Sequence, residues 1–380
     1  MKKNFFVLAA VVFSIRLSAQ SEQPTSDTAK GLDEVIVSAN KYPNKTSLTG
    51  KVVTVISQEQ IEKSGGKDLA QLLAEQAGVY IGGANSNPGK DKSIYLRGGS
   101  ISHTLIAIDG IPVSDPSGIG GNFDLRNLSL NNIERIEILK GSQSTLYGSD
   151  AINGVVNIIT RKNIKKPFGA NALVSYGSNE TFRGHAGING KKGITDYNAS
   201  FAYHGTKGIN ETENKNNIPV TDKDSYKQTS FQLDMGIRPS EKFSIKPFFR
   251  YGRLSGDIDQ GAFTDELDYT YTQKSWQAGL KNEFTIGKSK INLLYNYNNI
   301  YRLYIDDSVK SRNGYDTYSK GDYSGGEHLV DAYVYTPLHK LLKLTAGGDF
   351  RFTDINYNYL SLPAWGPPTA IDTTLSQQGF

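Results

Sequence analysis

Two stretches in the first half of the chain decide the fold: residues 132–141 read NIERIEILKG, and residues 147–160 read YGSDAINGVVNIIT. Each contains a run of β-branched and other apolar residues, which favours a strand. Glycines at positions 141, 148 and 154 separate the runs and permit sharp turns or close backbone contacts. We therefore expect two strands joined by a short link, in a small domain that mixes helices and strands.

The residues before these two stretches fit the same small domain. Residues 52–56 favour a strand, and Ser57 is suited to cap the helical turn that follows. Residues 68–78 place apolar groups at helical spacing and end in glycine. Residues 104–113 contain two apolar runs separated by Asp-Gly, which predicts a tight hairpin.

These blocks, together with residues 94–98 and 105–110, resemble the plug domain of TonB-dependent outer-membrane receptors. They keep the family's order and spacing across residues 33–160, apart from residues 76–79, QAGV, where the family usually has proline before the glycine. The resemblance implies an α+β plug domain, residues 46–165, inside a transmembrane antiparallel β-barrel. It also implies a receptor and active transporter in the outer membrane of a Gram-negative bacterium.

The N-terminus is organised for export. Lys2 and Lys3 precede an apolar run at residues 5–13 that is too short to span a bilayer as a helix, so residues 1–19 are expected to form a signal peptide. Residues 20–45 are expected to form a tether. Within it lies a short β-prone run suited to adding a strand to another protein's sheet. By the resemblance this run is similar to the TonB box, the segment that binds TonB: Asp33, Glu34, Val35, Ile36, Val37, Ser38 and Ala39.

Residues 166–380 show the alternation of apolar and polar residues that a barrel strand needs, for example at residues 231–238. Short links, such as residues 287–289, alternate with long polar ones at residues 206–225, 254–272 and 304–326. We expect about nine strands, with a tenth beginning at the chain's end, whereas receptors of this family close about 22. The barrel is therefore expected to be incomplete. An interfacial girdle is predicted from four tyrosines: Tyr295, Tyr297, Tyr301 and Tyr304.

Charged plug residues are suited to pair with one another or with the polar lumen of the barrel. As a group they predict a polar contact between plug and barrel wall, which yields to a pull more readily than an apolar core. The predicted group is Arg97, Glu134, Arg135, Glu137 and Lys140.

The ligand expected from the resemblance is cobalamin, because residues 102–110 and 274–280 look most like the cobalamin receptors of the family. The substrate would rest on two polar plug loops, with Asn85, Ser86, Asn87, Ser114 and Asp115 as binding residues. Cobalamin receptors also use calcium held by acidic loops. Four aspartates are expected to supply such a Ca²⁺ site here: Asp222, Asp224, Asp257 and Asp259. A siderophore, delivered as a metal chelate, is the alternative ligand.

Composition limits the other classes of function. The net charge is only +4 and there is no long basic block, which argues against nucleic acid as a partner. The chain has no cysteine, and it contains neither a G-x-S-x-G elbow nor an HExxH motif, so we expect no enzyme. The expected partners are TonB, with ExbB and ExbD acting through it, and outer-membrane lipid around a monomer. A non-transporting surface binding protein, an exported hydrolase and an inactive truncated receptor are the rival interpretations.

Overall fold

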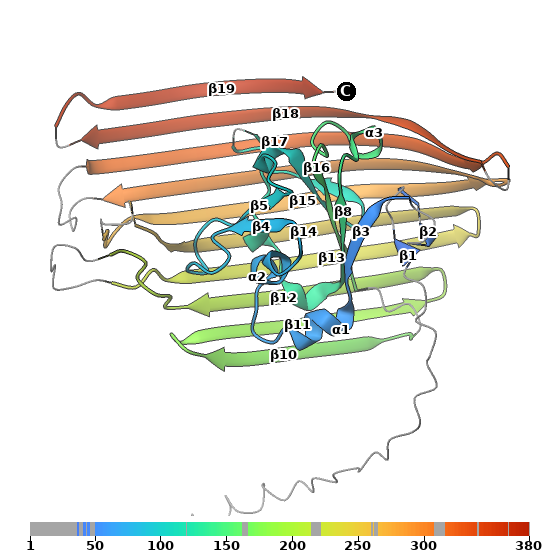
Figure 1. Cartoon of the computed structure of the whole chain (residues 1–380), viewed down its shortest axis with the longest axis horizontal. Coiled ribbons are helices and arrows are strands. Elements are labelled where there is room, and N and C mark those ends of the chain that lie inside the picture. The colour runs from blue at the N-terminus through green and yellow to red at the C-terminus, as the bar shows by residue number, and fades with distance from the viewer. Residues whose placement is uncertain are drawn as a thin grey trace, which may run out of the picture. The chain divides into compact units, whose positions relative to one another are not determined.

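The computed structural model describes residues 36–37, 41–42, 44–45, 50–118, 120–161, 166–213, 222–259, 261, 265–307, 316–339, 342–363 and 365–379. They form a small mixed domain, here called the plug (residues 50–161), and a ten-stranded sheet, here called the wall (residues 169–379). The expected signal peptide lies outside the described residues. Figure 1 shows the plug elements over one face of the wall.

The plug is built on a five-stranded sheet in the order β3-β8-β9-β6-β7. Strands β6 and β9 pair in parallel, and the other neighbours are antiparallel. The strands are β3 (Val52–Ile56), β6 (Thr104–Ile108), β7 (Ile111–Val113), β8 (Ile133–Lys140) and β9 (Gly154–Thr160). A separate hairpin pairs β4 (Val79–Gly82) with β5 (Ser93–Leu96).

Short helices complete the plug: α1 (Gln58–Lys63), α2 (Leu69–Ala74), α3 (Ser144–Tyr147) and the 3₁₀ turns η2 (Ile101–His103), η3 (Leu125–Asn127) and η4 (Leu130–Asn132). Ser57 caps α1 with a complete capping box, as its position suggested, and Asp68 caps α2 in the same way. Leu73 and Ile136 are fully buried in the cluster that joins α2 to the sheet. A second apolar cluster, including Tyr147, covers the opposite face of the sheet.

Two positions in the plug show why glycine is needed. Asp109 and Gly110, which connect β6 to β7, have φ angles of 54° and 77°, the conformation that a two-residue type I′ hairpin turn requires. A side chain at Gly154 would meet the main chain of Leu139 on the neighbouring strand β8, so only glycine allows β8 and β9 to pair there. The predicted hairpin is therefore confirmed, and Gly154, at the opposite end of the sheet, allows the close spacing of β8 and β9.

The wall consists of consecutive antiparallel strands, each paired with the next. They are β10 (Gly169–Gly177), β11 (Thr181–Lys192), β12 (Thr195–Thr206), β13 (Tyr226–Ser240), β14 (Phe243–Asp257), β15 (Thr270–Ile286), β16 (Ser289–Asp307), β17 (Asp316–Pro337), β18 (Lys343–Pro363) and β19 (Thr369–Gly379). The sheet thus has ten strands where about nine were expected. Strand β19 was underestimated because main-chain pairing with β18 does not require apolar side chains.

Alternation separates the two faces of the wall. On β16 the side chains of Leu294, Asn296 and Asn298 are buried toward the plug, whereas those of Leu293 and Tyr295 are exposed on the outward face. The strands run further into the long links than expected: β14 and β15 leave only residues 258–269 between them. The reason is that cross-strand pairing continues past the apolar band.

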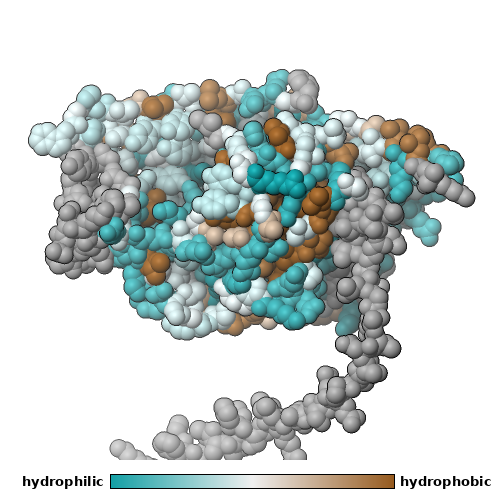
Figure 2. All heavy atoms as spheres, viewed as in Figure 1, coloured by the Kyte–Doolittle hydropathy of each residue, from teal (hydrophilic) through white to brown (hydrophobic). Residues whose placement is uncertain are grey.

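Surface character agrees with this division. In the space-filling view of the same side, hydrophilic groups are mixed with separate hydrophobic patches, without a continuous apolar area (Figure 2). Such a mixed surface suits the aqueous lumen of a barrel better than contact with lipid. Among the described residues, no helix is both long and apolar enough to cross a membrane.

Candidate functional site

Charged pairs connect the plug to three strands of the wall. Asp109 lies 3.8 Å from Arg250 of β14, and Asp150 lies 2.6 Å from Arg351 of β18. Asp115 pairs with Arg302 of β16. The polar contact that the sequence predicted is present, although its residues differ from the predicted group. Arg135 pairs with Glu134 and Glu137, which all lie on β8, so within the predicted group the other alternative, pairing of the charges with one another, is the one observed for these three residues.

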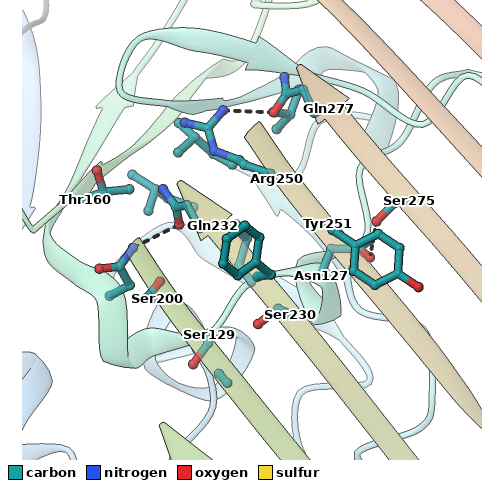
Figure 3. Close-up of a pocket in the computed structure, with 18 of the residues that line it drawn as sticks. Asn127, Ser129, Thr160, Ser200, Ser230, Gln232, Arg250, Tyr251, Ser275 and Gln277 are labelled. Carbon is teal, nitrogen blue, oxygen red and sulfur yellow. Dashed lines mark hydrogen bonds between the residues drawn. The ribbon is translucent and has the colours of Figure 1, made fainter. Parts of the chain in front are cut away.

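Ile111 of β7 adds an apolar contact with Phe248 and Leu294 of the wall, and amide and hydroxyl groups supply further polar contacts. The Asn132 side chain donates to Gln232 of β13 at 2.9 Å, and Ser275 of β15 donates to Asn127 at 3.3 Å (Figure 3). Arg250 donates to Gln277 at 2.9 Å beside a cavity of about 70 Å³ (Figure 3). These bonds are directional but individually contribute only about 1 kcal/mol, since water can replace them. The hydrogen bonds therefore fix the position of the plug, but each one can be broken at a small cost in free energy.

The first predicted ligand loop, around residue 87, is fixed at the end of the wall that carries the long links. Asn87 is buried, and its amide donates to the main-chain oxygens of Ile209 (3.0 Å) and Asp224 (2.8 Å). The Lys92 amine binds main-chain oxygens of the same loop, including that of Asn87 at 3.2 Å. Asn85 is exposed and Ser86 is half-buried, so these two are the more accessible members of the predicted set.

The second predicted ligand loop also contacts the wall. The Ser114 hydroxyl donates to Glu327 at 2.8 Å, and the Ser114 main-chain oxygen accepts from Asn298 at 2.7 Å. Asp115 is buried, with one carboxylate oxygen accepting from Ser117 and the other facing Arg302. The predicted binding roles of Ser114 and Asp115 stay predictions. In this structure both residues hold the loop against the wall.

A row of tyrosines in ring contact lines the inner face of the wall. The ring centroids of Tyr271 and Tyr304 lie 6.1 Å apart, those of Tyr304 and Tyr323 6.1 Å, and those of Tyr323 and Tyr357 4.6 Å. Together with Arg302, three of these rings border a cavity of about 480 Å³. Such an aromatic, hydrogen-bonding surface suits a large ligand with flat or conjugated parts.

The position of Tyr304 corrects the predicted girdle. Tyr304 lies on the inner face, because β16 turns its even-numbered residues toward the plug. Tyr295 and Tyr297 are odd-numbered and lie on the outward face beside His328. The run of tyrosines was visible in the sequence. Its division between two faces required the register of the strand.

Acidic side chains gather where two long links meet. Carboxylate oxygens of Asp222, Asp259 and Asp265 all lie within 4.8 Å of one another. Asp222 and Asp259 were both predicted as calcium ligands, whereas Asp265 was missed. The acidic stretch at residues 265–268 could have indicated Asp265 as a further ligand. A second group brings together Glu266, Asp268 and Asp306.

The other two predicted calcium ligands border this cluster. The Asp257 carboxylate accepts the main-chain N–H of Ser225 at 3.2 Å. Asp224 is buried, lies near Asp259 and lines a cavity of about 290 Å³ with Asn87 and Lys90. The structure therefore brings Asp222 and Asp259 together in the three-carboxylate group, and places Asp224 and Asp257 next to it.

Burial and mutual repulsion change the acidity of this cluster. Burial, reinforced by the charge of Asp259, raises the pKa of Asp224 to about 7. Burial raises the pKa of Asp259 to about 6, and the charges of Asp265 and Asp222 add to the rise, while a hydrogen bond from the Glu266 main chain opposes it. Carboxylates held this close are stabilised by a proton or by a cation. Several oxygen ligands at one point suit Ca²⁺.

The predicted TonB box is described only in part. Ile36–Val37 forms β1 and pairs with β2, Asn44–Lys45, while the other residues of the box lie outside the described part of the chain. Lys41, between β1 and β2, lies 2.8 Å from Asp331 of β17. The ring of Tyr42 contacts that of Tyr335 in a tilted arrangement, with ring centroids 4.1 Å apart. These contacts lie near the short turn between β17 and β18, at the end opposite the acidic cluster.

Comparisons with known proteins agree with this architecture. Residues 45–155 match the family model of the TonB-dependent receptor plug domain. The vitamin B12 transporter BtuB of Photobacterium profundum is 24% identical over 98% of this chain and 64% of its own length.

Two solved structures have the same fold. One is the ferripyoverdine receptor of the outer membrane of Pseudomonas aeruginosa, with a TM-score of 0.68 and 14% identity over 90% of this chain and 50% of that one. The other is BauA, the ferric preacinetobactin receptor of Acinetobacter baumannii, with a TM-score of 0.66 and 17% identity over 88% of this chain and 55% of that one. The expected architecture, a plug with part of a transmembrane barrel, is confirmed. The chain spans about half to two thirds of the length of these relatives.

The acidic cluster predicts calcium binding that depends on pH. Since calcium must displace protons from carboxylates whose pKa values are raised, affinity should increase as pH rises through 6–7, and be at least about tenfold weaker at pH 5 than at pH 8. Without calcium, the raised pKa values stabilise the folded loops at low pH, and this stabilisation is lost as pH rises through the same range. Calorimetric titration of the purified protein with CaCl₂ measures the affinity.

Substitutions identify the ligands in the same titration. Asp265→Asn should weaken calcium binding by on the order of 10–100-fold, as loss of a metal-site residue does. Asp257→Asn should have a much smaller effect, because its carboxylate lies outside the three-residue group. Equal losses in the two variants, or binding that is independent of pH, would contradict the assignment.

Proposed function

Since this chain is a member of the TonB-dependent receptor family, we propose that it works in the outer membrane of a Gram-negative bacterium as a receptor and active transporter of a large, scarce ligand. The observation that carries the proposal is the plug attached to one face of the wall by polar contacts. Such contacts hold the plug in place at rest. They can also be exchanged for contacts with water when the plug moves.

In the proposed cycle, ligand binds at the end of the wall with the long links, where the tyrosine row and the two plug loops lie. Residues 33–39 then pair with TonB, which pulls on the plug. The pull acts first on Lys41 and Tyr42, the described residues nearest to this segment that contact the wall. Work comes from ExbB and ExbD through TonB, and no chemical reaction is required of this chain.

Cobalamin is the proposed ligand. The relative that matches nearly the whole chain is a vitamin B12 transporter, and the three-carboxylate group would supply the calcium site expected in such receptors. A siderophore is the second candidate, since the structurally similar proteins are receptors for ferric chelates. The tyrosine row beside Arg302 would suit an aromatic chelate equally well.

Binding to outer-membrane vesicles that contain the receptor distinguishes these ligands. Radiolabelled cyanocobalamin should bind saturably, and calcium should strengthen the binding by ordering the loops around the acidic cluster. Asp265→Asn should remove the calcium effect while leaving weaker binding in place. Saturable binding of a ferric siderophore without any binding of cyanocobalamin would overturn the choice of ligand and leave the transporter class in place.

A substitution in the N-terminal segment tests energised uptake. Ile36→Pro removes a main-chain N–H from the segment expected to add a strand to TonB, so uptake by cells should fall to the level of a strain that lacks TonB. Binding to vesicles should stay unchanged. Ile36→Val keeps the strand preference and should retain uptake. Uptake by the Ile36→Pro variant at the normal rate would instead favour the non-transporting surface protein.

A further inference from the structure

Three cations lie together on the outward face of the wall, near the end with the long links. Lys227 of β13, Arg253 of β14 and Lys274 of β15 are all exposed. Arg253 and Lys274 are direct cross-strand partners. Lys227 is opposite Ser255, so it is the diagonal neighbour of Arg253. Cross-strand side chains of this kind are about 5 Å apart at Cβ, and diagonal ones about 7–8 Å.

The cations have no acidic counterpart among the described residues. All three cations belong to the part of the chain that the structure describes. Within that part, their side chains form no hydrogen bond and no ion pair. Asp322, an outward carboxylate on β17, accepts from the Tyr301 hydroxyl at 3.2 Å and lies 4.0 Å from Lys320. Like charges directly opposite each other destabilise a sheet. An anion from outside the chain would relieve that repulsion.

The outward face below the cations is apolar. Two residues along each strand toward the short turns, Tyr251 is opposite Trp276, which is 39% exposed. Further along β15 in the same direction come Leu280, which is also exposed, and Phe284, which stacks on Phe243. This band continues to Ile286, at the end of the strand.

The length of the apolar band indicates how far the cations lie from the centre of the membrane. Trp276 and Ile286 are ten residues apart on β15, which corresponds to roughly 34 Å along a strand and, with a tilt of about 40°, to about 25 Å across the membrane. This height matches that of the apolar band of outer-membrane barrels. Tyr251 and Trp276 would then form the aromatic boundary at the outer surface. Arg253 and Lys274, two residues beyond, lie at the level of the lipid headgroups.

We propose that Lys227, Arg253 and Lys274 form a binding site for the phosphate of an outer-leaflet lipid. The hydroxyl of Thr229, directly opposite Arg253, is a further donor in the same row. A lipid is the occupant because the cations face outward, continue the apolar band and lie on the opposite face from the cavities expected to take soluble ligand. Guanidinium and ammonium groups side by side bind a phosphate through charge-assisted hydrogen bonds. The inference rests on the proposed location in the outer membrane.

Native mass spectrometry of the receptor purified in detergent tests this site, with diphosphoryl lipid A and monophosphoryl lipid A as probes. The diphosphoryl form should be retained more strongly. The double variant Arg253→Gln with Lys274→Gln should bind it roughly 30-fold more weakly, from about 1 kcal/mol for each cation. Lys320→Gln, a cation on the same face that lies next to Asp322, is the matched control and should bind lipid normally.

Several outcomes would overturn the proposal. Equal retention by the double variant and the unaltered receptor would mean that these cations are solvated surface charges. Competition by inorganic phosphate at the same concentration as the lipid would assign the site to free phosphate. Cyanocobalamin binding by the unaltered receptor separates this inference from the proposed function. If the unaltered receptor binds cyanocobalamin but not diphosphoryl lipid A, only the lipid site is refuted. If it binds the lipid but not cyanocobalamin, only the choice of ligand is refuted.

Discussion

The period of two along the wall strands is the constraint on which the remaining structure depends. Because successive side chains point to opposite faces, each strand must supply lipid-facing apolar residues and plug-facing polar residues in turn. On β16, Leu293 and Tyr295 serve the first role, and Asn296 and Asn298 serve the second. A polar inner face cannot bind an apolar domain without leaving buried groups unpaired. The plug therefore meets the wall largely through Asp109, Asp115, Asp150 and a set of amides, with one apolar contact at Ile111.

The plug itself is stabilised in a different way from its contact with the wall. Its sheet is covered with apolar residues on both faces, around Leu73 and Ile136 on one and Tyr147 on the other. Removing a residue such as Leu73 would cost several kcal/mol, whereas one plug-to-wall hydrogen bond contributes about 1 kcal/mol. Force applied through the N-terminal segment should therefore separate the contact with the wall before it disrupts the plug's core. Such an order suits a plug that opens and closes repeatedly.

Sequence reasoning succeeded where the determinants are local. The capping residue Ser57, the Asp109-Gly110 turn and the apolar faces of β13 and β15 are all set by neighbours within a few positions. It was less successful where the determinants are distant along the chain. Asp115 pairs with Arg302, 187 residues away, and Asp265 joins Asp222 only because two loops fold toward each other. Tyr304 was assigned to the wrong face because it was grouped with Tyr295 and Tyr297. These two have odd numbers and face outward, whereas even-numbered residues of β16 face the plug.

The central claim is that the polar contact between plug and wall separates during transport, and a reversible tether tests it most directly. The chain has no cysteine of its own, so Asn127→Cys with Ser275→Cys would introduce a single possible disulfide where the two side-chain oxygens are now 3.3 Å apart. The account predicts that the oxidised receptor binds its ligand normally, fails to take it up, and recovers uptake when the disulfide is reduced, while each single cysteine variant transports throughout. Undiminished uptake with the tether fully formed would contradict it.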